Sequence, residues 1–147
     1  MDSAEIKSYV ARLVKRYGTA DPFSLAEKLN IIVFNVSLGE LQGFYMYLKK
    51  HRTVFLNSDI EDFDLKRVVL AHEIGHAMLH TKVNNYFMRK NTFLNTSKYE
   101  IQANRFAAEL LISDELIENN TDLTSAQLAR LARVSSALIE YKLSTYN

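Results

Sequence analysis

The chain has 147 residues, of which 48% are hydrophobic and 24% are charged, and its formal net charge at pH 7 is +1. This length and composition are typical of one domain with its own core, so we interpret residues 1–147 as a single domain. A net charge close to zero excludes a strong overall field that would attract nucleic acid or a membrane surface. The absence of cysteine excludes disulfide bonds and thiolate metal ligands.

The amino-terminal residues lack the charged start and apolar core of a signal peptide. No apolar run in the chain approaches the 18 residues of a candidate membrane-spanning helix. We therefore expect a cytoplasmic protein that does not associate with a membrane.

The first 30 residues predict two helices. Asp2 or Ser3 can cap a first helix, whose apolar residues form a stripe and which Gly18 ends. Pro22 lies at the start of a second, shorter pattern that runs through Leu29, and proline favours the first position of a helix.

A small sheet is predicted next in the chain. Residues 31–37 are β-branched and apolar, as is typical of a strand. Residues 44–48 and 53–57 have the pattern of a hairpin around a turn at residues 49–52. We therefore expect an α+β fold, in which a three-stranded antiparallel or mixed sheet packs on a helical body.

The sequence His-Glu-Ile-Gly-His occupies residues 72–76 and forms an HExxH motif. The residues around it have helical apolar spacing with a buried face, and Asp64 gives the segment an acidic start, so we expect a helix. Residues four apart lie on the same face of a helix, so His72 and His76 can bind one zinc ion together. Glu73 lies one position further round, where it can hydrogen-bond a water molecule at the metal.

A catalytic zinc site needs a third protein ligand and one open position. His80 lies roughly 12 Å from His72 along a straight helix, too far to complete the site. We expect His80 to be a helix-end histidine near the negative end of the helix dipole. His51 lies in a polar stretch that is predicted to form an exposed turn, which argues against a ligand role.

Glu100 is the better candidate for the third ligand. It opens a second helical pattern that runs to residue 111, and Asn104 follows one turn later, where it can orient a metal ligand. A carboxylate that is stabilised by the positive end of the helix dipole is an equally good interpretation of Glu100 from spacing alone.

Together, residues 70–80 and residues 100–111 resemble the two metal-binding blocks of the ImmA/IrrE metallopeptidases. Residues 43–44 and 54–57 are also similar to the strand pair that precedes the metal helix in that family. The resemblance extends over roughly residues 20 to 145, which is nearly the whole chain, although only the two metal blocks are specific.

The resemblance implies a zinc metallopeptidase with a zincin-like metal helix. It implies that His72, His76 and Glu100 bind the zinc and that Glu73 is the catalytic acid and base. Such a site supports peptide hydrolysis, because zinc activates water and polarises the scissile carbonyl.

Two positions depart from the family pattern. The family often has a second acidic residue where Gln102 stands and a proline where Ser113 stands. Neither residue is a proposed ligand, so these departures leave the expected chemistry intact and concern substrate preference.

A hydrogen-bond donor to the developing oxyanion is also expected, and Tyr86 and Tyr99 are unranked candidates. Tyr86 lies in the polar, irregular stretch 81–97 with Phe87 and Phe93. This stretch separates the two metal blocks, so its aromatic residues either line the cleft or simply pack.

From about residue 113 the chain is predicted to be helical. Residues 127–143 have the apolar spacing of a helix-turn-helix, although Arg133 occupies the position of the usual turn glycine. The second helix of this pattern carries Lys142 against Glu140, which is too little positive charge for phosphate contacts. We therefore expect no direct binding of nucleic acid, and interpret this end as a packing or substrate-docking element.

The resemblance also implies a substrate. Relatives act as anti-repressors that cleave a helix-turn-helix repressor encoded beside them in mobile elements or stress regulons, so we expect a protein substrate of this kind. Two alternatives stay open at this point. One is a regulator that binds DNA, and the other is a metal-binding interaction module without catalytic activity.

Overall fold

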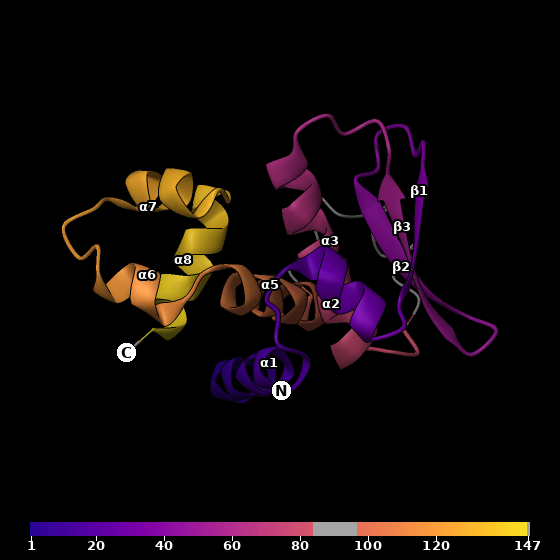
Figure 1. The fold of residues 1–147 in the computed structure, drawn as a ribbon, viewed down its shortest axis with the longest axis horizontal. Helices are drawn as coiled ribbons and strands as arrows, with labels where there is room; N and C mark the ends of the chain where they lie inside the picture. The colour runs from indigo at the N-terminus through magenta and orange to yellow at the C-terminus, as the bar shows by residue number, and fades with distance from the viewer. Residues whose placement is uncertain (84–96, 147) are drawn as a thin grey trace.

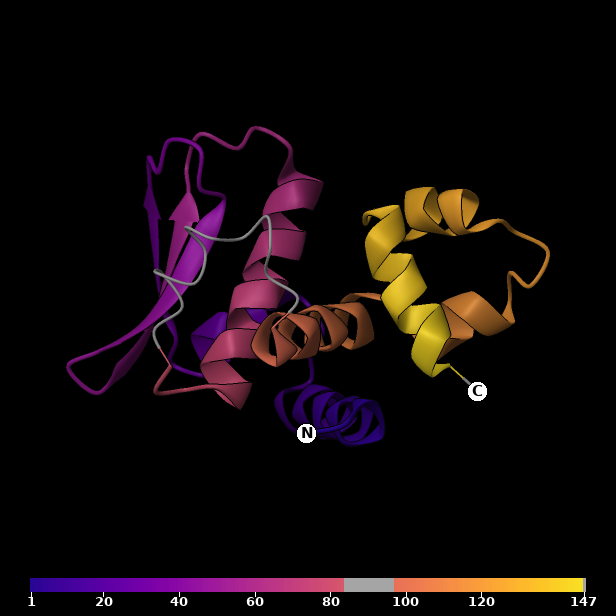
Figure 2. The ribbon, with the colours of Figure 1, turned by 180° about the vertical axis from the view of Figure 1, so that it is seen from behind.

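A computed structural model of the protein describes residues 1–83 and 97–146. These residues form seven helices and one three-stranded sheet, which confirms the predicted α+β class. The sheet stands at one end of the molecule and the carboxyl-terminal helices stand at the other, with α3 and α5 between them (Figures 1 and 2). Within the described segments, no helix has both the length and the apolar character needed to span a bilayer.

The first two helices begin and end where the sequence predicts. Helix α1 spans Ser3–Tyr17; the Asp2 carboxylate accepts a hydrogen bond from a backbone amide of its first turn, and Gly18 ends it with φ 71°. Only a residue that tolerates positive φ can form such a cap, which is why glycine stands there. Helix α2 spans Pro22–Lys28, and the Asp21 carboxylate caps it.

The three strands are β1 (Ile32–Val36), β2 (Gly43–Leu48) and β3 (His51–Asn57). They lie in the order β1-β3-β2, so the longest strand is central. Strand β1 is parallel to β3, and β2 is antiparallel to it, so the sheet is mixed. The inner face of the sheet contributes buried side chains to the core, among them Val54 and Leu56.

The hairpin turn is shorter than the sequence indicates. Lys49 and Lys50 have φ values of 48° and 66°, as in the two-residue turns that match the twist of a hairpin. His51 pairs with Leu48 and therefore belongs to β3 rather than to a four-residue turn. Its side chain is exposed, as expected.

Helix α3 (Phe63–Leu79) is the central element and carries the HExxH motif. The Asp62 side chain caps it by accepting hydrogen bonds from the first-turn amides. Its buried surface is broader than the one-sided face predicted from the sequence, because the whole run from Val69 to Ala77 is buried. The sheet, α2 and α5 all pack against α3, and only small parts of Val69 and His72 stay exposed in this run.

The second half of the described chain is helical, as predicted from about residue 113. It consists of α5 (Lys98–Leu111), α6 (Asp114–Glu118), α7 (Ser125–Ala132) and α8 (Ser136–Thr145). Helix α5 packs against α3, α1 and α8 and so connects the two ends of the molecule. Ser113, one of the two departures from the family pattern, caps α6 with its hydroxyl.

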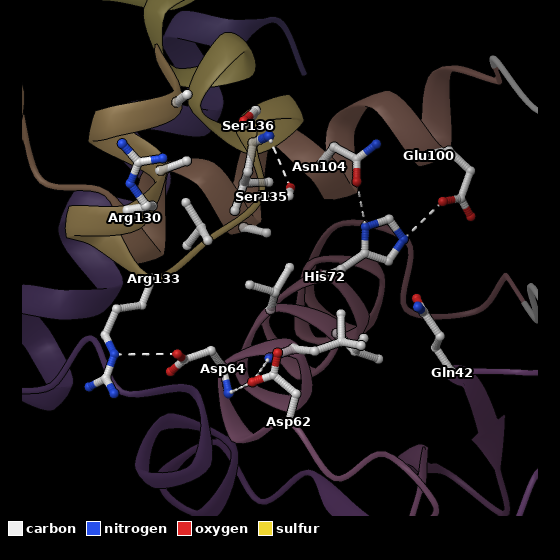
Figure 3. Close-up of a pocket in the computed structure, with 18 residues that line it drawn as sticks. Gln42, Asp62, Asp64, His72, Glu100, Asn104, Arg130, Arg133, Ser135 and Ser136 are labelled. Carbon is white, nitrogen blue, oxygen red and sulfur yellow. Dashed lines mark hydrogen bonds and ion pairs between the residues drawn. The ribbon is translucent and has the colours of Figure 1, made fainter. Parts of the chain in front are cut away.

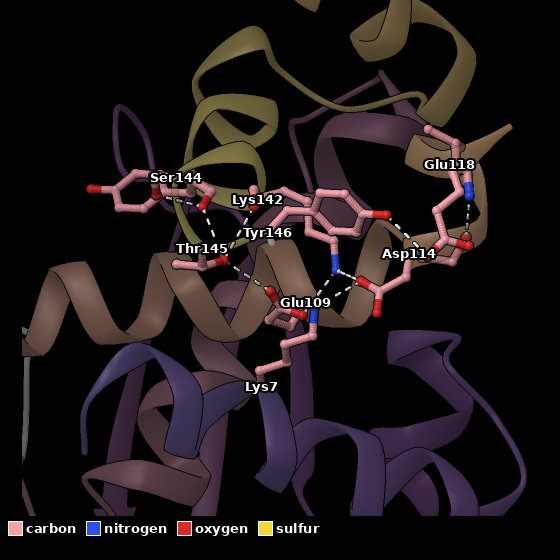
Figure 4. Close-up of polar contacts among 11 residues, drawn as sticks. Lys7, Glu109, Asp114, Glu118, Lys142, Ser144, Thr145 and Tyr146 are labelled. Atoms are coloured by element: carbon pink, nitrogen blue, oxygen red, sulfur yellow. Dashed lines mark hydrogen bonds and ion pairs between the residues drawn. The ribbon is translucent and has the colours of Figure 1, made fainter. Parts of the chain in front are cut away.

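A partly buried ion-pair cluster joins α8 to α1, α5 and α6 (Figure 4). The Lys142 side chain is 2% exposed, and its Nζ donates to Glu109 on α5 at 3.0 Å and to Asp114 on α6 at 2.6 Å. Lys7 on α1 donates to the same Asp114 carboxylate at 2.9 Å. The hydrogen bond from Lys142 holds the pKa of Asp114 below its ordinary value. The ion pairs therefore link four helices: α1, α5, α6 and α8.

We expect Lys142→Ala to lower the free energy of unfolding at pH 7 by about 3–5 kcal/mol, because it leaves the Glu109 carboxylate buried without its cation. Urea denaturation measures this difference. Lys15→Ala, an exposed lysine on α1, is the control and should change stability by about 0.5 kcal/mol or less. Equal effects of the two substitutions would contradict a structural role for the cluster.

The loss should also depend on pH. Because the folded-state pKa of Asp114 is lowered, its contribution to stability is present above the ordinary aspartate pKa of about 3.9 and disappears as the pH falls through the folded-state pKa. The stability difference between wild type and Lys142→Ala should therefore narrow below about pH 4.

Candidate metal centre

The side chains of His72, His76 and Glu100 converge where α3 meets α5. The Nε2 atoms of His72 and His76 lie 3.2 Å apart. One oxygen of the Glu100 carboxylate is 2.8 Å from Nε2 of His72, and the other is 3.1 Å from Nε2 of His76. All three residues are buried, with exposed fractions of 8%, 1% and 8%. Figure 3 shows His72 between Asn104 and Glu100, both of which belong to α5.

These three residues suit a divalent metal ion. Two imidazole nitrogens and a carboxylate oxygen are a donor set that zinc prefers, with bonds of about 2.0–2.2 Å. Neighbouring ligands in a tetrahedral shell of that size are about 3.3 Å apart. The ligand atoms of His72, His76 and Glu100 are separated by 2.8 to 3.2 Å, close to this value, so the three residues could hold one ion.

Gly75, inside the motif, allows the two helices to approach closely. A Cβ atom at this position would lie 3.1 Å from Cα of Ala103 and 3.1 Å from Cβ of Phe106, both on α5. These contacts involve backbone and near-backbone atoms, which cannot move aside without moving the helix. The missing side chain at Gly75 therefore lets the first turn of α5 reach the two histidines.

We expect Gly75→Val to separate α3 from α5, which should lower both the melting temperature and the zinc occupancy of the purified protein. Overpacking of this kind typically destabilises a protein by about 1–3 kcal/mol. Ala11→Val on the exposed face of α1 is the control for placing a β-branched residue in a helix, and should change both quantities little. Calorimetry and metal analysis measure the two effects. Normal zinc occupancy in Gly75→Val would show that the close approach is not required.

Glu100 lies at the start of a helix and also faces the two histidines, so it combines the two roles that the sequence left open. It lies in the first turn of α5, where its backbone amide donates to the capping hydroxyl of Ser97. Its carboxylate nevertheless points to the two histidines. Burial alone would raise the pKa of Glu100, but hydrogen bonds with His72 and His76 outweigh burial and leave the pKa well below its ordinary value. The group is therefore ionised, as a metal ligand must be.

Asn104 occupies the position expected of a residue that orients a ligand. Its side-chain oxygen lies 2.8 Å from Nδ1 of His72. Its amide nitrogen donates to the hydroxyl of Tyr141 on α8 at 3.3 Å. Tyr141 had no signal in the sequence, because the contact joins residues that are 37 positions apart. The carboxyl-terminal helix thus supports the metal centre through Asn104.

His80 caps the carboxyl end of α3, as predicted for a helix-end histidine. It is also buried, and its Nδ1 lies 3.2 Å from Nδ1 of His76. Its other nitrogen, Nε2, lies 2.6 Å from the side-chain oxygen of Gln102. Burial lowers the pKa of His80, which favours the neutral imidazole. Sequence reasoning did not identify this second contact with the centre.

Glu73 is fully buried between α3 and the start of β2. A Cβ atom at Gly43 would lie 3.8 Å from its Cγ, and 2.9 Å from the carbonyl oxygen of Phe55. Gly43 therefore provides room for β2 to pass close to the helix beside this carboxyl group.

Two tyrosines, Tyr86 and Tyr99, were considered as donors to the oxyanion. Tyr86 lies in the stretch 84–96, together with Phe87 and Phe93, which is outside the described residues. The Tyr99 ring packs edge-on against His80, with ring centroids 4.6 Å apart, and is not among the residues that line the neighbouring cavity.

A cavity of about 970 Å³ opens beside the metal centre (Figure 3). His72, Glu100 and Asn104 line it, and so do residues of α7, of α8 and of the turn between them. Its wall on α3 and α5 combines aliphatic side chains, such as Val68 and Val69, with polar ones, and Arg130 of α7 also borders it. Ligand pockets of proteins have volumes in this range.

The turn between α7 and α8 is attached to α3. Arg67 donates to the carbonyl oxygens of Ala132 and Arg133 at 2.8 and 3.1 Å. In the opposite direction, Arg133 forms an ion pair with Asp64 at 3.3 Å. Arg133 adopts φ 61°, the left-handed conformation that the usual turn glycine would provide. Two helices joined by a turn therefore occupy the residues that have helix-turn-helix spacing, and this turn forms part of the cavity wall.

The peptidase M78 family, described as the IrrE N-terminal-like domain, matches residues 26–144. The chain belongs to this family. The uncharacterized immunity region protein 2 of Bacillus phage phi105 is 38% identical over 140 residues, which cover 93% of this chain and 88% of that protein. Metallopeptidase ImmA of Bacillus subtilis (strain 168) is 27% identical over 146 residues, which cover 97% of this chain and 86% of that protein. The resemblance to the ImmA/IrrE family is thereby confirmed.

Proposed function

We propose that the protein is a zinc-dependent endopeptidase in which His72, His76 and Glu100 hold the metal and Glu73 is the catalytic acid and base. The observation that carries this proposal is the convergence of three buried ligand atoms from two helices beside a large cavity. Membership of a metallopeptidase family supports the same conclusion.

Each residue has a defined role in the proposed reaction. A bound zinc would polarise the scissile carbonyl and lower the pKa of a water molecule toward neutrality. Glu73 would take a proton from the attacking water as its oxygen adds to the carbonyl carbon, and would deliver that proton to the amine nitrogen as the C–N bond breaks. Asn104 keeps His72 oriented throughout, because its side-chain oxygen accepts the Nδ1 proton.

We expect Glu100→Ala to lose most of its bound zinc, because two histidines alone leave the ion without its anionic ligand. Metal analysis of the purified, folded variant measures this loss. Glu115→Ala, an exposed carboxylate on α6, is the matched control and should bind zinc like the wild type. Undiminished occupancy in folded Glu100→Ala would remove Glu100 from the proposed ligand set.

For the substrate, we propose a helix-turn-helix repressor of a mobile element or stress regulon, so that cleavage relieves repression. The similarity to an immunity region protein of a phage supports a mobile-element setting. The cavity supports a polypeptide substrate, because it begins at His72 and Glu100 and continues along α3 to the turn between α7 and α8.

The structure favours the enzyme over the DNA-binding alternative. In a DNA-binding helix-turn-helix, the first residues of the second helix contact base edges. Here the corresponding residues, Ser135 and Ser136, line the cavity beside the metal centre. Arg67 also holds the preceding turn against α3. This surface is thus oriented toward the proposed substrate site.

We expect Glu73→Gln to abolish cleavage of the proposed substrate, a helix-turn-helix repressor, while zinc content and melting temperature stay near wild type. The substitution preserves size but removes the basic carboxylate. Electrophoresis and mass spectrometry of repressor incubated with each protein measure cleavage. Wild-type rates in Glu73→Gln would contradict the role of Glu73, whereas inactivity of both proteins would favour the non-catalytic metal-binding module.

A further inference from the structure

A buried chain of side-chain contacts leads away from the metal centre on the side opposite Asn104. It runs from His76 to His80 and then to Gln102, through contacts of 3.2 Å and 2.6 Å. His76 and His80 are 1% and 7% exposed, so their mutual contact is shielded from water, whereas Gln102 is half-buried. The HExxH motif does not require either of the two outer residues.

The chemistry of each group determines where the protons lie. If His76 is to bind a metal through Nε2, that atom must carry a lone pair, and the proton of the neutral ring must be on Nδ1. The nearest partner of this proton is Nδ1 of His80, which must therefore be an acceptor. A neutral His80 that accepts through Nδ1 carries its own proton on Nε2. That proton faces the side-chain oxygen of Gln102, which can only accept.

The orientation of the Gln102 amide is set independently. Its nitrogen, Nε2, donates to the backbone carbonyl oxygen of Met1 at 3.0 Å. A carbonyl oxygen is only an acceptor, so the nitrogen must face Met1 and the oxygen must face His80. The orientation of the Gln102 amide therefore fixes which atom donates and which accepts in each hydrogen bond from His76 to Met1.

We propose that Gln102 and His80 are positioning residues that hold His76 in the tautomer able to bind the metal. This inference rests on the proposed metal site. On the other side of the centre, Asn104 does the same for His72 directly, through its side-chain oxygen. Helix α5 thus supplies one ligand, Glu100, and two amide oxygens that determine the protonation of both histidines on α3. Groups of this kind that hold metal-binding histidines typically change metal affinity about 10–100-fold when removed.

Two substitutions of Gln102 distinguish its role as a hydrogen-bond acceptor for His80 from a purely structural role. Gln102→Met removes the acceptor for His80 and the donor to Met1, with little change in side-chain length. Gln102→Glu also removes the donor to Met1, but it retains an acceptor oxygen for Nε2–H of His80. A purely structural role of the contact with Met1 would affect both variants alike, whereas a tautomer role affects only the first.

Zinc affinity is measured by competition with a chromophoric chelator, and the tautomers of the metal-free protein are measured by ¹H–¹⁵N NMR of the imidazoles. We expect Gln102→Met to bind zinc about 10–100-fold more weakly than wild type and to shift the His76 proton from Nδ1 toward Nε2. Gln102→Glu should retain the wild-type tautomer and bind zinc within a few-fold of wild type. His80→Phe, which keeps an aromatic ring against Tyr99, should weaken binding at least as much as Gln102→Met.

Equal affinities of wild type, Gln102→Met and Gln102→Glu would overturn the inference, and so would equal losses in the two variants. His76→Ala is measured alongside to test the site itself. Loss of zinc binding in His76→Ala together with wild-type affinity in Gln102→Met would reject only the positioning role. Unchanged zinc binding in His76→Ala would reject the proposed metal site and, with it, this inference.

Discussion

The close approach of α3 and α5 is the contact on which the rest of the site depends. Packed helices are usually 8–10 Å apart, and small residues at the crossing favour the shorter separations. Gly75 and Ala103 supply these small residues at the point where the helices meet. Only at short separation does a carboxylate in the first turn of α5 reach Nε2 of two histidines on α3. The glycine of the motif thus contributes to the metal centre through packing.

Burying the charged and polar groups of this candidate centre costs solvation free energy. A carboxylate or a pair of imidazoles that is removed from water loses several kcal/mol of solvation unless other groups compensate. Here Glu100 faces the two histidines, and both outer imidazole nitrogens face other polar side chains. The arrangement aligns the lone pairs toward a common point, where a cation would complete the charge balance. Metal binding and folding stability are therefore coupled in such a site.

The carboxyl-terminal helices connect the core of the fold to the candidate metal centre. Their sequence has the apolar spacing of a helix-turn-helix, and in the tertiary structure the turn of this unit borders the cavity beside the candidate metal centre. Tyr141 on α8 holds Asn104, and residues of the turn form a cavity wall. Lys142, one residue later on the same helix, fastens it to α5 and α6. The same helix therefore stabilises the fold, shapes the cavity and supports His72 of the candidate metal centre through Asn104.

The sequence alone determined the features that depend on short-range spacing: the helix caps, the strand segments, the HExxH pair on one helical face and Glu100 at the start of a second helix. The tertiary structure alone decided which distant side chains meet. It established that β1 is parallel to β3, that α3 is buried from Val69 to Ala77, and that His80, Gln102 and Tyr141 lie around the candidate centre. The reason is physical: spacing along a helix is set by backbone geometry, whereas contacts between remote segments depend on how whole elements pack.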